Sequence, residues 1–162
     1  MRKTISFKQK FIPLIVSGVK TQTRRLKKEG EYLMTIGWEE RGVFCQSGKP
    51  RFEIQDVCRV VDENANPVWY CSNCKKCYVF DNWQNGLTCL CRMRDKVRPL
   101  EVKILSIREQ KLKSITNKEA EAEVGLGFKY PRKVFFKDFF ECYPDCKEKN
   151  PVVWALKFEK VI

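Results

Sequence analysis

The 162-residue sequence contains no histidine. Histidine is the usual general base near pH 7 and the commonest metal ligand, so acid–base chemistry would have to come from Lys, Glu, Asp, Tyr or Cys. No apolar stretch approaches the roughly 18 residues of a membrane-spanning helix, and no signal-peptide or lipidation motif is present. We therefore expect a cytoplasmic protein with no membrane partner.

Acidic residues are scarce relative to basic ones. The chain has 20 Asp or Glu against 32 Lys or Arg, a formal net charge of +12. Nine of the basic residues fall within residues 1–30, where only one Glu occurs, and a second group follows at Arg92, Arg94, Lys96 and Arg98. Basic charge gathered in this way is typical of a surface that binds a polyanion, although general solubility would explain it too.

Hydrophobic residues make up 43% of the chain, enough for the core of a single domain over residues 1–162. Apolar spacing that ends at Gly18 predicts a short helix. Short apolar runs bounded by turn residues then predict many strands over 31–70, and an alternating run predicts a closing strand over 152–158.

Two helices are predicted in the second half of the chain. Thr116 and Glu119 have the spacing of a capping box ahead of a short helix that Gly125 would end. Aromatic residues then recur at helical spacing over 136–143, which predicts an amphipathic helix with an aromatic face in the core. The order of elements favours a mainly β, α+β fold: a small β-barrel with flanking short helices.

Five of the nine cysteines lie within a Cys-rich insert, residues 71–95. Two knuckle-like cysteine groups separated by a short excursion are the usual arrangement of a structural zinc site, because four thiolates complete a tetrahedral ion. We predict a structural zinc ion held by four of the five insert cysteines, which are Cys71, Cys74, Cys77, Cys89 and Cys91. An iron–sulfur cluster, disulfides and unligated cysteines are the alternatives.

Residues 18–25 read Gly-Val-Lys-Thr-Gln-Thr-Arg-Arg. As a strand, this segment would place Thr21, Thr23 and Arg25 on one face and the intervening residues on the other. Lys20, at the start of the strand, could then lean over Thr23. The cations could hold phosphate, or a Lys with a lowered pKa could activate a threonine hydroxyl.

This segment resembles the signature of the ASCH family, a branch of the PUA-like superfamily. The family's hallmark is a Gly-x-Lys-Thr-x-Thr-x-Arg run, matched here by Gly18, Lys20, Thr21, Thr23 and Arg25. The resemblance resumes over 115–123 and again over 150–158. It implies a small PUA-like β-barrel with a cleft beside the signature, which would bind RNA or a nucleotide.

One branch of the family hydrolyses N4-acetylcytidine, with a Lys, the second Thr of the signature and a Glu of the later helix. The resemblance implies that the corresponding catalytic residues here are Lys20, Thr23 and Glu123. Glu119 and Glu121 are near neighbours that a small shift of the alignment would exchange for Glu123.

We therefore predict a nucleic-acid-binding module, with RNA as the expected partner and DNA or a modified nucleoside as alternatives. The predicted contact residues are Lys20, Thr21, Arg24, Arg25, Lys27, Lys28, Arg92 and Arg94. Two other interpretations stay open. One is a small hydrolase, either an amidohydrolase of the N4-acetylcytidine type or a ribonuclease. The other is a zinc-stabilised adaptor for a protein partner.

Overall fold

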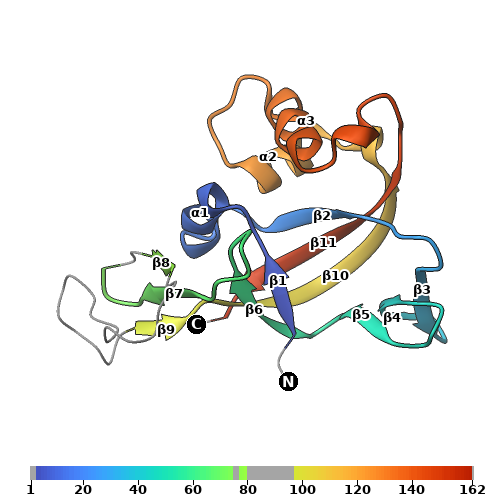
Figure 1. The fold of residues 1–162 in the computed structure, drawn as a ribbon, viewed down its shortest axis with the longest axis horizontal. Coiled ribbons are helices and arrows are strands. Elements are labelled where there is room, and N and C mark those ends of the chain that lie inside the picture. Colours follow the sequence, from blue (N-terminus) through green and yellow to red (C-terminus); the bar gives the residue numbers. More distant parts are fainter. Residues whose placement is uncertain (1–2, 75–76, 80–96, 162) are drawn as a thin grey trace. The chain divides into compact units, whose positions relative to one another are not determined.

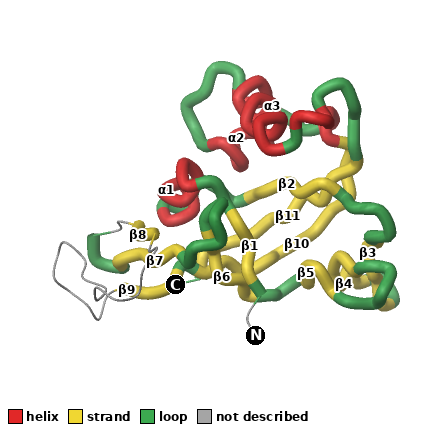
Figure 2. Tube along the Cα trace, in the orientation of Figure 1, coloured by secondary structure: helices red, strands yellow, loops and turns green. Residues whose placement is uncertain are grey.

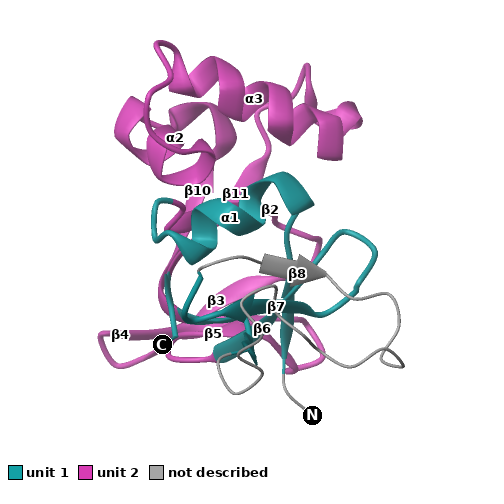
Figure 3. Ribbon diagram, turned by 90° about the vertical axis from the view of Figure 1, so that its left-hand side faces the viewer, with its two compact units in different colours: residues 1–19, 57–103, 159–162 teal, residues 20–56, 104–158 magenta. Residues whose placement is uncertain are grey.

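A computed structural model describes residues 3–74, 77–79 and 97–161 of the chain. The chain divides into two compact units, drawn in different colours in Figure 3. Unit 1 contains residues 1–19, 57–103 and 159–162, and unit 2 contains residues 20–56 and 104–158. No helix within the described ranges has both the length and the apolar character needed to cross a membrane.

Unit 1 is built from short strands and one short helix, labelled in Figure 1. Its elements are β1 (Thr4–Ser6), η1 (Gln9–Phe11), α1 (Ile12–Val16), β6 (Val57–Val61), β7 (Val68–Cys71), β8 (Cys77–Val79), β9 (Val97–Pro99) and the start of β10 (Glu101–Lys111). β1 pairs in parallel with β6, and β6 pairs antiparallel with the first residues of β10. β7 lies between β8 and β9 in a separate antiparallel sheet.

The helix predicted before Gly18 is present as η1 followed by α1. Pro13 lies in its first turn, where the missing N–H costs no hydrogen bond. Gly18 follows with φ +77°, the left-handed conformation that commonly ends a helix and that glycine adopts without strain. Ile12 and Ile15 are buried in the core of this unit.

Unit 2 holds the longer strands and the two longer helices. Its elements are β2 (Gln22–Leu26), β3 (Tyr32–Ile36), β4 (Glu39–Phe44), β5 (Pro50–Glu53), most of β10, η4 (Leu112–Ser114), α2 (Asn117–Val124), α3 (Pro131–Cys142), η5 (Pro144–Cys146) and β11 (Val152–Lys160). Figure 2 shows β10, β11 and β2 running side by side, with β11 in the middle. β3, β4 and β5 form a second, antiparallel sheet.

The two helices of unit 2 pack against each other and enclose an apolar cluster. Phe135 and Phe139 of α3 are buried there with Ala120 and Val124 of α2. Phe136, Phe140 and Tyr143 are partly buried against the same cluster. The predicted aromatic face therefore belongs to the core, and the helix begins five residues earlier than its aromatic pattern indicated.

The predicted α+β class is confirmed, but the predicted closure into a β-barrel is wrong for the described residues. β1 pairs with β6, and β2 pairs with β11. Both β1 and β2 are edge strands of the described sheet, so the sheet stays open. Residues 32–53, which could have extended a barrel, pair among themselves instead as β3, β4 and β5. Gly37, with φ +62°, lies in the tight connection between β3 and β4 that makes this local pairing favourable.

A buried carboxylate joins distant segments of unit 2. Glu31 accepts hydrogen bonds from Trp154 Nε1 at 2.8 Å, from Arg51 Nη1 at 2.7 and 2.8 Å, and from the Lys28 backbone N–H at 2.9 Å. Trp154 lies in β11 and Arg51 in β5. Burial alone would raise the pKa of Glu31, but these hydrogen bonds and the Arg51 charge outweigh it and hold the pKa below its ordinary value of 4.5.

We expect Glu31→Gln to lower the free energy of unfolding at pH 7 by about 1–3 kcal/mol, because buried donors lose a charged acceptor. A lowered folded-state pKa means that the ionised carboxylate stabilises the fold above pH 4.5, and that this contribution is lost as the pH falls through the folded pKa. Urea denaturation from pH 7 to pH 3 should therefore show the wild-type advantage over Glu31→Gln shrinking. An advantage that is independent of pH would contradict this account.

Candidate functional site

The signature segment and the helix α2 meet in unit 2. The capping box at the start of α2 is formed as predicted: the Glu119 N–H donates to Thr116 Oγ1 at 3.2 Å, and the Thr116 N–H donates to Glu119 Oε2 at 2.9 Å. Near the other end of the helix, the Thr21 N–H donates to the Ala122 carbonyl oxygen at 3.0 Å. This bond holds the segment before β2 against the last turn of α2.

Glu123 accepts hydrogen bonds from two cationic side chains, Lys20 and Arg24, where the signature segment meets α2. Lys20 Nζ donates to the Glu123 backbone carbonyl at 2.6 Å and approaches Glu123 Oε2 at 3.4 Å, while Arg24 Nη1 donates to Glu123 Oε1 at 2.6 Å. Lys20 is 3% exposed and Glu123 is 4% exposed. Lys20 lies two residues before β2 and Arg24 lies within it, and both side chains reach Glu123.

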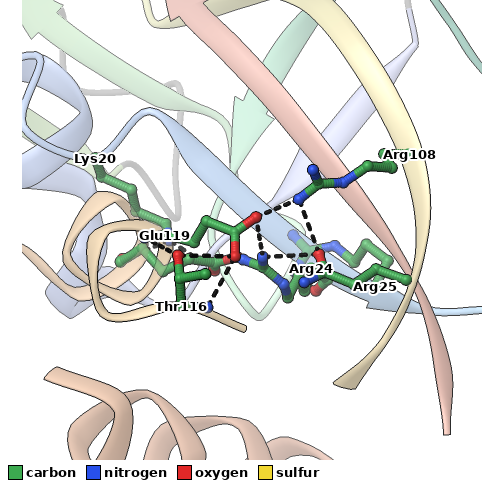
Figure 4. A network of polar contacts seen from close by, with 8 residues as sticks. Lys20, Arg24, Arg25, Arg108, Thr116 and Glu119 are labelled. Carbon is green, nitrogen blue, oxygen red and sulfur yellow. Dashed lines mark hydrogen bonds and ion pairs between the residues drawn. The ribbon is translucent and has the colours of Figure 1, made fainter. Parts of the chain in front are cut away.

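A second carboxylate extends the network, as Figure 4 shows. Arg24 Nη2 lies 3.3 Å from Glu119 Oε1, and Arg108 also pairs with Glu119. Gln110 Oε1 accepts from Arg24 Nη2 at 3.0 Å and from Arg108 Nη2 at 3.2 Å. The buried Nε of Arg24 has no hydrogen-bond partner within the described part of the chain, so one strong donor of this guanidinium stays unsatisfied.

Burial and neighbouring cations change the acidity of the site. Burial lowers the pKa of Lys20 from 10.5 to about 8; the Glu123 charge opposes this shift and the Arg25 charge adds to it. Burial also lowers the pKa of Arg25, against the opposing effects of Tyr143 and Glu123. Lys20 is therefore divided between its ammonium and amine forms near pH 8, which is unusual for a lysine.

The network carries an excess of positive charge. Lys20, Arg24, Arg25 and Arg108 are cationic near neutral pH, and Glu119 and Glu123 supply the carboxylates that pair with them. Lys20 and Arg24 are buried whereas the Arg108 side chain is 62% exposed, and an anion or a carbonyl oxygen would complement donors of this kind. We call this set of six residues the Glu123 network.

The structure brings together two of the three residues that were predicted to be catalytic. Lys20 and Glu123 are joined directly, and Glu123 rather than Glu121 is the carboxylate that faces the signature. Thr23 is buried as well, in the strand position next to Arg24, so alternation assigns it to the other face of β2. The catalytic role of all three residues stays a prediction.

The other predicted contact residues have varied surroundings. Arg24 is fully buried and engaged by carboxylates, whereas Lys28 is exposed. Lys27 pairs with Glu109 at 2.8 Å and lies 5.0 Å from the centre of the Trp154 ring. Arg92 and Arg94 lie outside the described residues.

The predicted zinc ligands are described only in part. Cys71 is buried in β7, Cys74 follows the end of that strand, and Cys77 begins β8. Cys89 and Cys91 lie outside the described residues. The zinc site therefore stays a prediction.

Sequence reasoning missed Arg108, Gln110 and the full part that Glu119 plays. Arg108 and Gln110 are two residues apart on β10, and Glu119 and Glu123 are four residues apart on α2. Both spacings place side chains on one face of their element, which is the signal that could have found them. Only the tertiary structure, which brings Arg24 of β2, Gln110 of β10 and Glu119 of α2 into contact, turns these separate faces into one network.

No family model and no curated protein matches the chain. A solved structure that it resembles is protein EF3133 from Enterococcus faecalis V583, described as family-model DUF984, with 13% identity and a TM-score of 0.50 over 99% of this chain and 81% of that one. The chain has the fold of this Enterococcus protein. Because the identity is only 13%, the similarity concerns the fold alone.

Another matched structure is an ASCH domain from Lactobacillus crispatus JV V101, with 15% identity and a TM-score of 0.47 over 91% of this chain and 67% of that one. The prediction of an α+β fold is confirmed.

The lowered pKa of Lys20 leads to a prediction about stability. Between about pH 8 and 10.5 the unfolded chain binds more protons at Lys20 than the folded chain does, so this residue makes stability rise with pH in that window. We expect the stability of the wild type, measured relative to Lys20→Met by urea denaturation, to improve from pH 7.5 to pH 10. A difference that stays constant over this range would contradict the lowered pKa.

A matched pair of substitutions on α2 tests the pairing itself. Glu123→Gln should lower the free energy of unfolding by about 3–5 kcal/mol, because it leaves two buried cations with a neutral partner. Glu121→Gln, on the same helix but outside the network, should change it by no more than about 0.5 kcal/mol. Equal effects of the two substitutions in urea denaturation would show that Glu123 has no special part in the fold.

Proposed function

We propose that the protein binds RNA or a nucleotide at the Glu123 network, as the ASCH-like signature implies. The ligand would place a phosphate or a base carbonyl oxygen against the cations of this network, with Lys20, Arg25 and Arg24 Nε as the groups within the site. The exposed Lys28 would contact the phosphate backbone outside it.

The observation that carries this proposal is the pair of buried cations in the network, Lys20 and Arg24. Burying a charge is unfavourable unless a partner compensates it, and perturbed pKa values gather at functional sites more than elsewhere. The pKa of Lys20 is lowered to about 8, and Arg24 carries one buried guanidinium N–H without a partner among the described residues. Structural ion pairs alone would not need the unsatisfied donor.

A binding assay with a mononucleotide tests the proposal. We expect wild-type protein to bind cytidine 5′-monophosphate in isothermal titration calorimetry at low salt. Arg25→Gln should weaken this binding about tenfold or more, because it removes a hydrogen bond to a charged group. Arg25 is chosen because it is only partly buried and lies next to Arg24 in β2, so its substitution leaves the pairs of Glu123 with Lys20 and Arg24 in place.

Lys149→Gln is the matched control, since Lys149 is an exposed cation of the same unit and lies outside the network. Its affinity should equal that of the wild type. The proposal fails if no mononucleotide binds at low salt, or if Arg25→Gln and Lys149→Gln behave alike.

A second candidate function is hydrolysis of an acylated nucleoside, and the pKa of about 8 at Lys20 is the observation that favours it. A lysine amine that is partly unprotonated near neutral pH can accept a proton from a nucleophile such as the Thr23 hydroxyl. Attack on an acetyl carbonyl would break its bond to the amine nitrogen of the nucleoside, and water would then release acetate.

The test of this second function is the hydrolysis of N4-acetylcytidine, followed by chromatography. Since the amine form of Lys20 would act as the base, the rate should rise with pH and level off above about pH 8. Lys20→Met and Thr23→Val should abolish turnover, whereas Thr23→Ser should retain part of it. No product from wild-type protein across this pH range would count against the hydrolase.

A further inference from the structure

The connection between α2 and α3 exposes apolar side chains that the core does not use. Leu126 is 73% exposed, Phe128 is 45% exposed and Tyr130 is 54% exposed. These three residues alternate along a short segment that begins directly after Gly125. Large apolar side chains gathered on a surface are unusual in a soluble domain and mark a place where something binds.

The charged residues within residues 125–137, the stretch that holds these side chains, are all cations. Between residues 125 and 137 the chain contains no Asp or Glu, and its exposed cations there are Lys129, Arg132, Lys133 and Lys137. Two of them lie beside one aromatic ring: Lys129 Nζ is 5.4 Å and Lys133 Nζ is 4.8 Å from the centre of the Tyr130 ring. We call residues 126–137 the aromatic–basic segment.

The backbone holds this segment in a defined position. Gly127 has φ +91°, a conformation that a residue with a side chain rarely adopts, so it turns the chain without strain. The Lys133 N–H donates to the Tyr130 carbonyl at 3.0 Å, which joins the loop to the first turn of α3. α3 is in turn anchored through buried Phe135 and Phe139. The exposed rings therefore lie on a loop that is fixed to the buried helix α3.

Another exposed aromatic residue in unit 2 shows why the charge matters. Trp38, between β3 and β4, is fully exposed but is followed directly by Glu39 and Glu40. Carboxylates beside an exposed ring disfavour a polyanion, whereas lysines beside a ring attract one. Tyr130 and Phe128 are exposed aromatic residues in a stretch, residues 125–137, whose charged residues are all cations, whereas Trp38 is followed by two carboxylates.

We infer that the aromatic–basic segment binds single-stranded nucleic acid. Bases stack on Phe128 and Tyr130, and the phosphates between them are bound by Lys129, Arg132, Lys133 and Lys137. Stacking platforms interleaved with cations are the combination by which proteins bind single strands, because every base has an aromatic face. The inference takes its ligand class from the proposed function, but it rests on residues outside the Glu123 network.

The experiment measures the binding of a fluorescein-labelled 12-nucleotide single-stranded RNA by fluorescence anisotropy at low salt. Tyr130→Ala and Phe128→Ala should each weaken binding about fivefold or more, because each removes a stacking surface. Trp38→Ala, the control with a fully exposed ring beside carboxylates, should bind like the wild type. Lys133→Gln should reduce the slope of log affinity against log salt concentration by about 0.7, the contribution of one phosphate contact to a single strand.

These side chains are exposed, so the variants should keep the wild-type thermal unfolding midpoint, measured by circular dichroism. The inference is overturned if Tyr130→Ala and Phe128→Ala bind the RNA as Trp38→Ala does, which would leave the segment to a protein partner. It is also overturned if the wild type binds a duplex of the same sequence as tightly as the single strand.

The outcome separates this inference from the proposed function. Loss of cytidine 5′-monophosphate binding in Arg25→Gln, together with unchanged RNA binding in Tyr130→Ala, would support the Glu123 network and reject the aromatic–basic segment. RNA binding that depends on Tyr130, without any binding of the mononucleotide, would reject the proposed function and support the segment.

Discussion

The pairing of Glu123 with Lys20 and Arg24 is the interaction on which unit 2 depends. Three charged side chains are removed from water there, and each would be strongly unfavourable without the other two. Arg24 Nη1 donates to the Glu123 side-chain Oε1, and Lys20 Nζ donates to the Glu123 backbone carbonyl oxygen. Both distances are 2.6 Å. This arrangement requires that the start of β2 and the end of α2 lie together, and the Thr21–Ala122 backbone bond fixes that distance.

The same helix serves the core and the charged network at once. Ala120 and Val124 of α2 face the aromatic residues of α3, while Glu119 and Glu123 face the arginines of β2 and β10. Glu119 also completes the capping box with Thr116, so one carboxylate caps the start of the helix and pairs with cations. Burial would raise the pKa of Glu119, but bonds from Thr116 and the arginines outweigh it and keep the pKa low.

Buried ion pairs are weak evidence for stability, because well-packed apolar residues of similar volume often stabilise a fold as much or more. The value of the Glu123 network therefore lies in what its charges can do. In the proposed function, the ammonium group with a pKa of about 8 and the guanidinium groups beside it would supply hydrogen-bond donors that need little reorganisation. The aromatic–basic segment, in the loop that follows α2, adds an exposed surface of the same charge sign.

The sequence by itself determined the local features of this protein. The capping box at Thr116, the end of the first helix at Gly18, the closing strand and the aromatic face of α3 all follow from spacing and side-chain chemistry within a few residues. The resemblance to the ASCH signature also singled out Lys20, Thr23 and Glu123, of which the structure joins Lys20 and Glu123. Tertiary structure alone decided that Arg24 is buried rather than exposed, that Arg108 and Gln110 join it, and that β3, β4 and β5 pair among themselves instead of closing a barrel. These outcomes depend on contacts between residues up to about a hundred positions apart, such as Lys20 and Glu123 at a separation of 103, and no local pattern encodes such contacts.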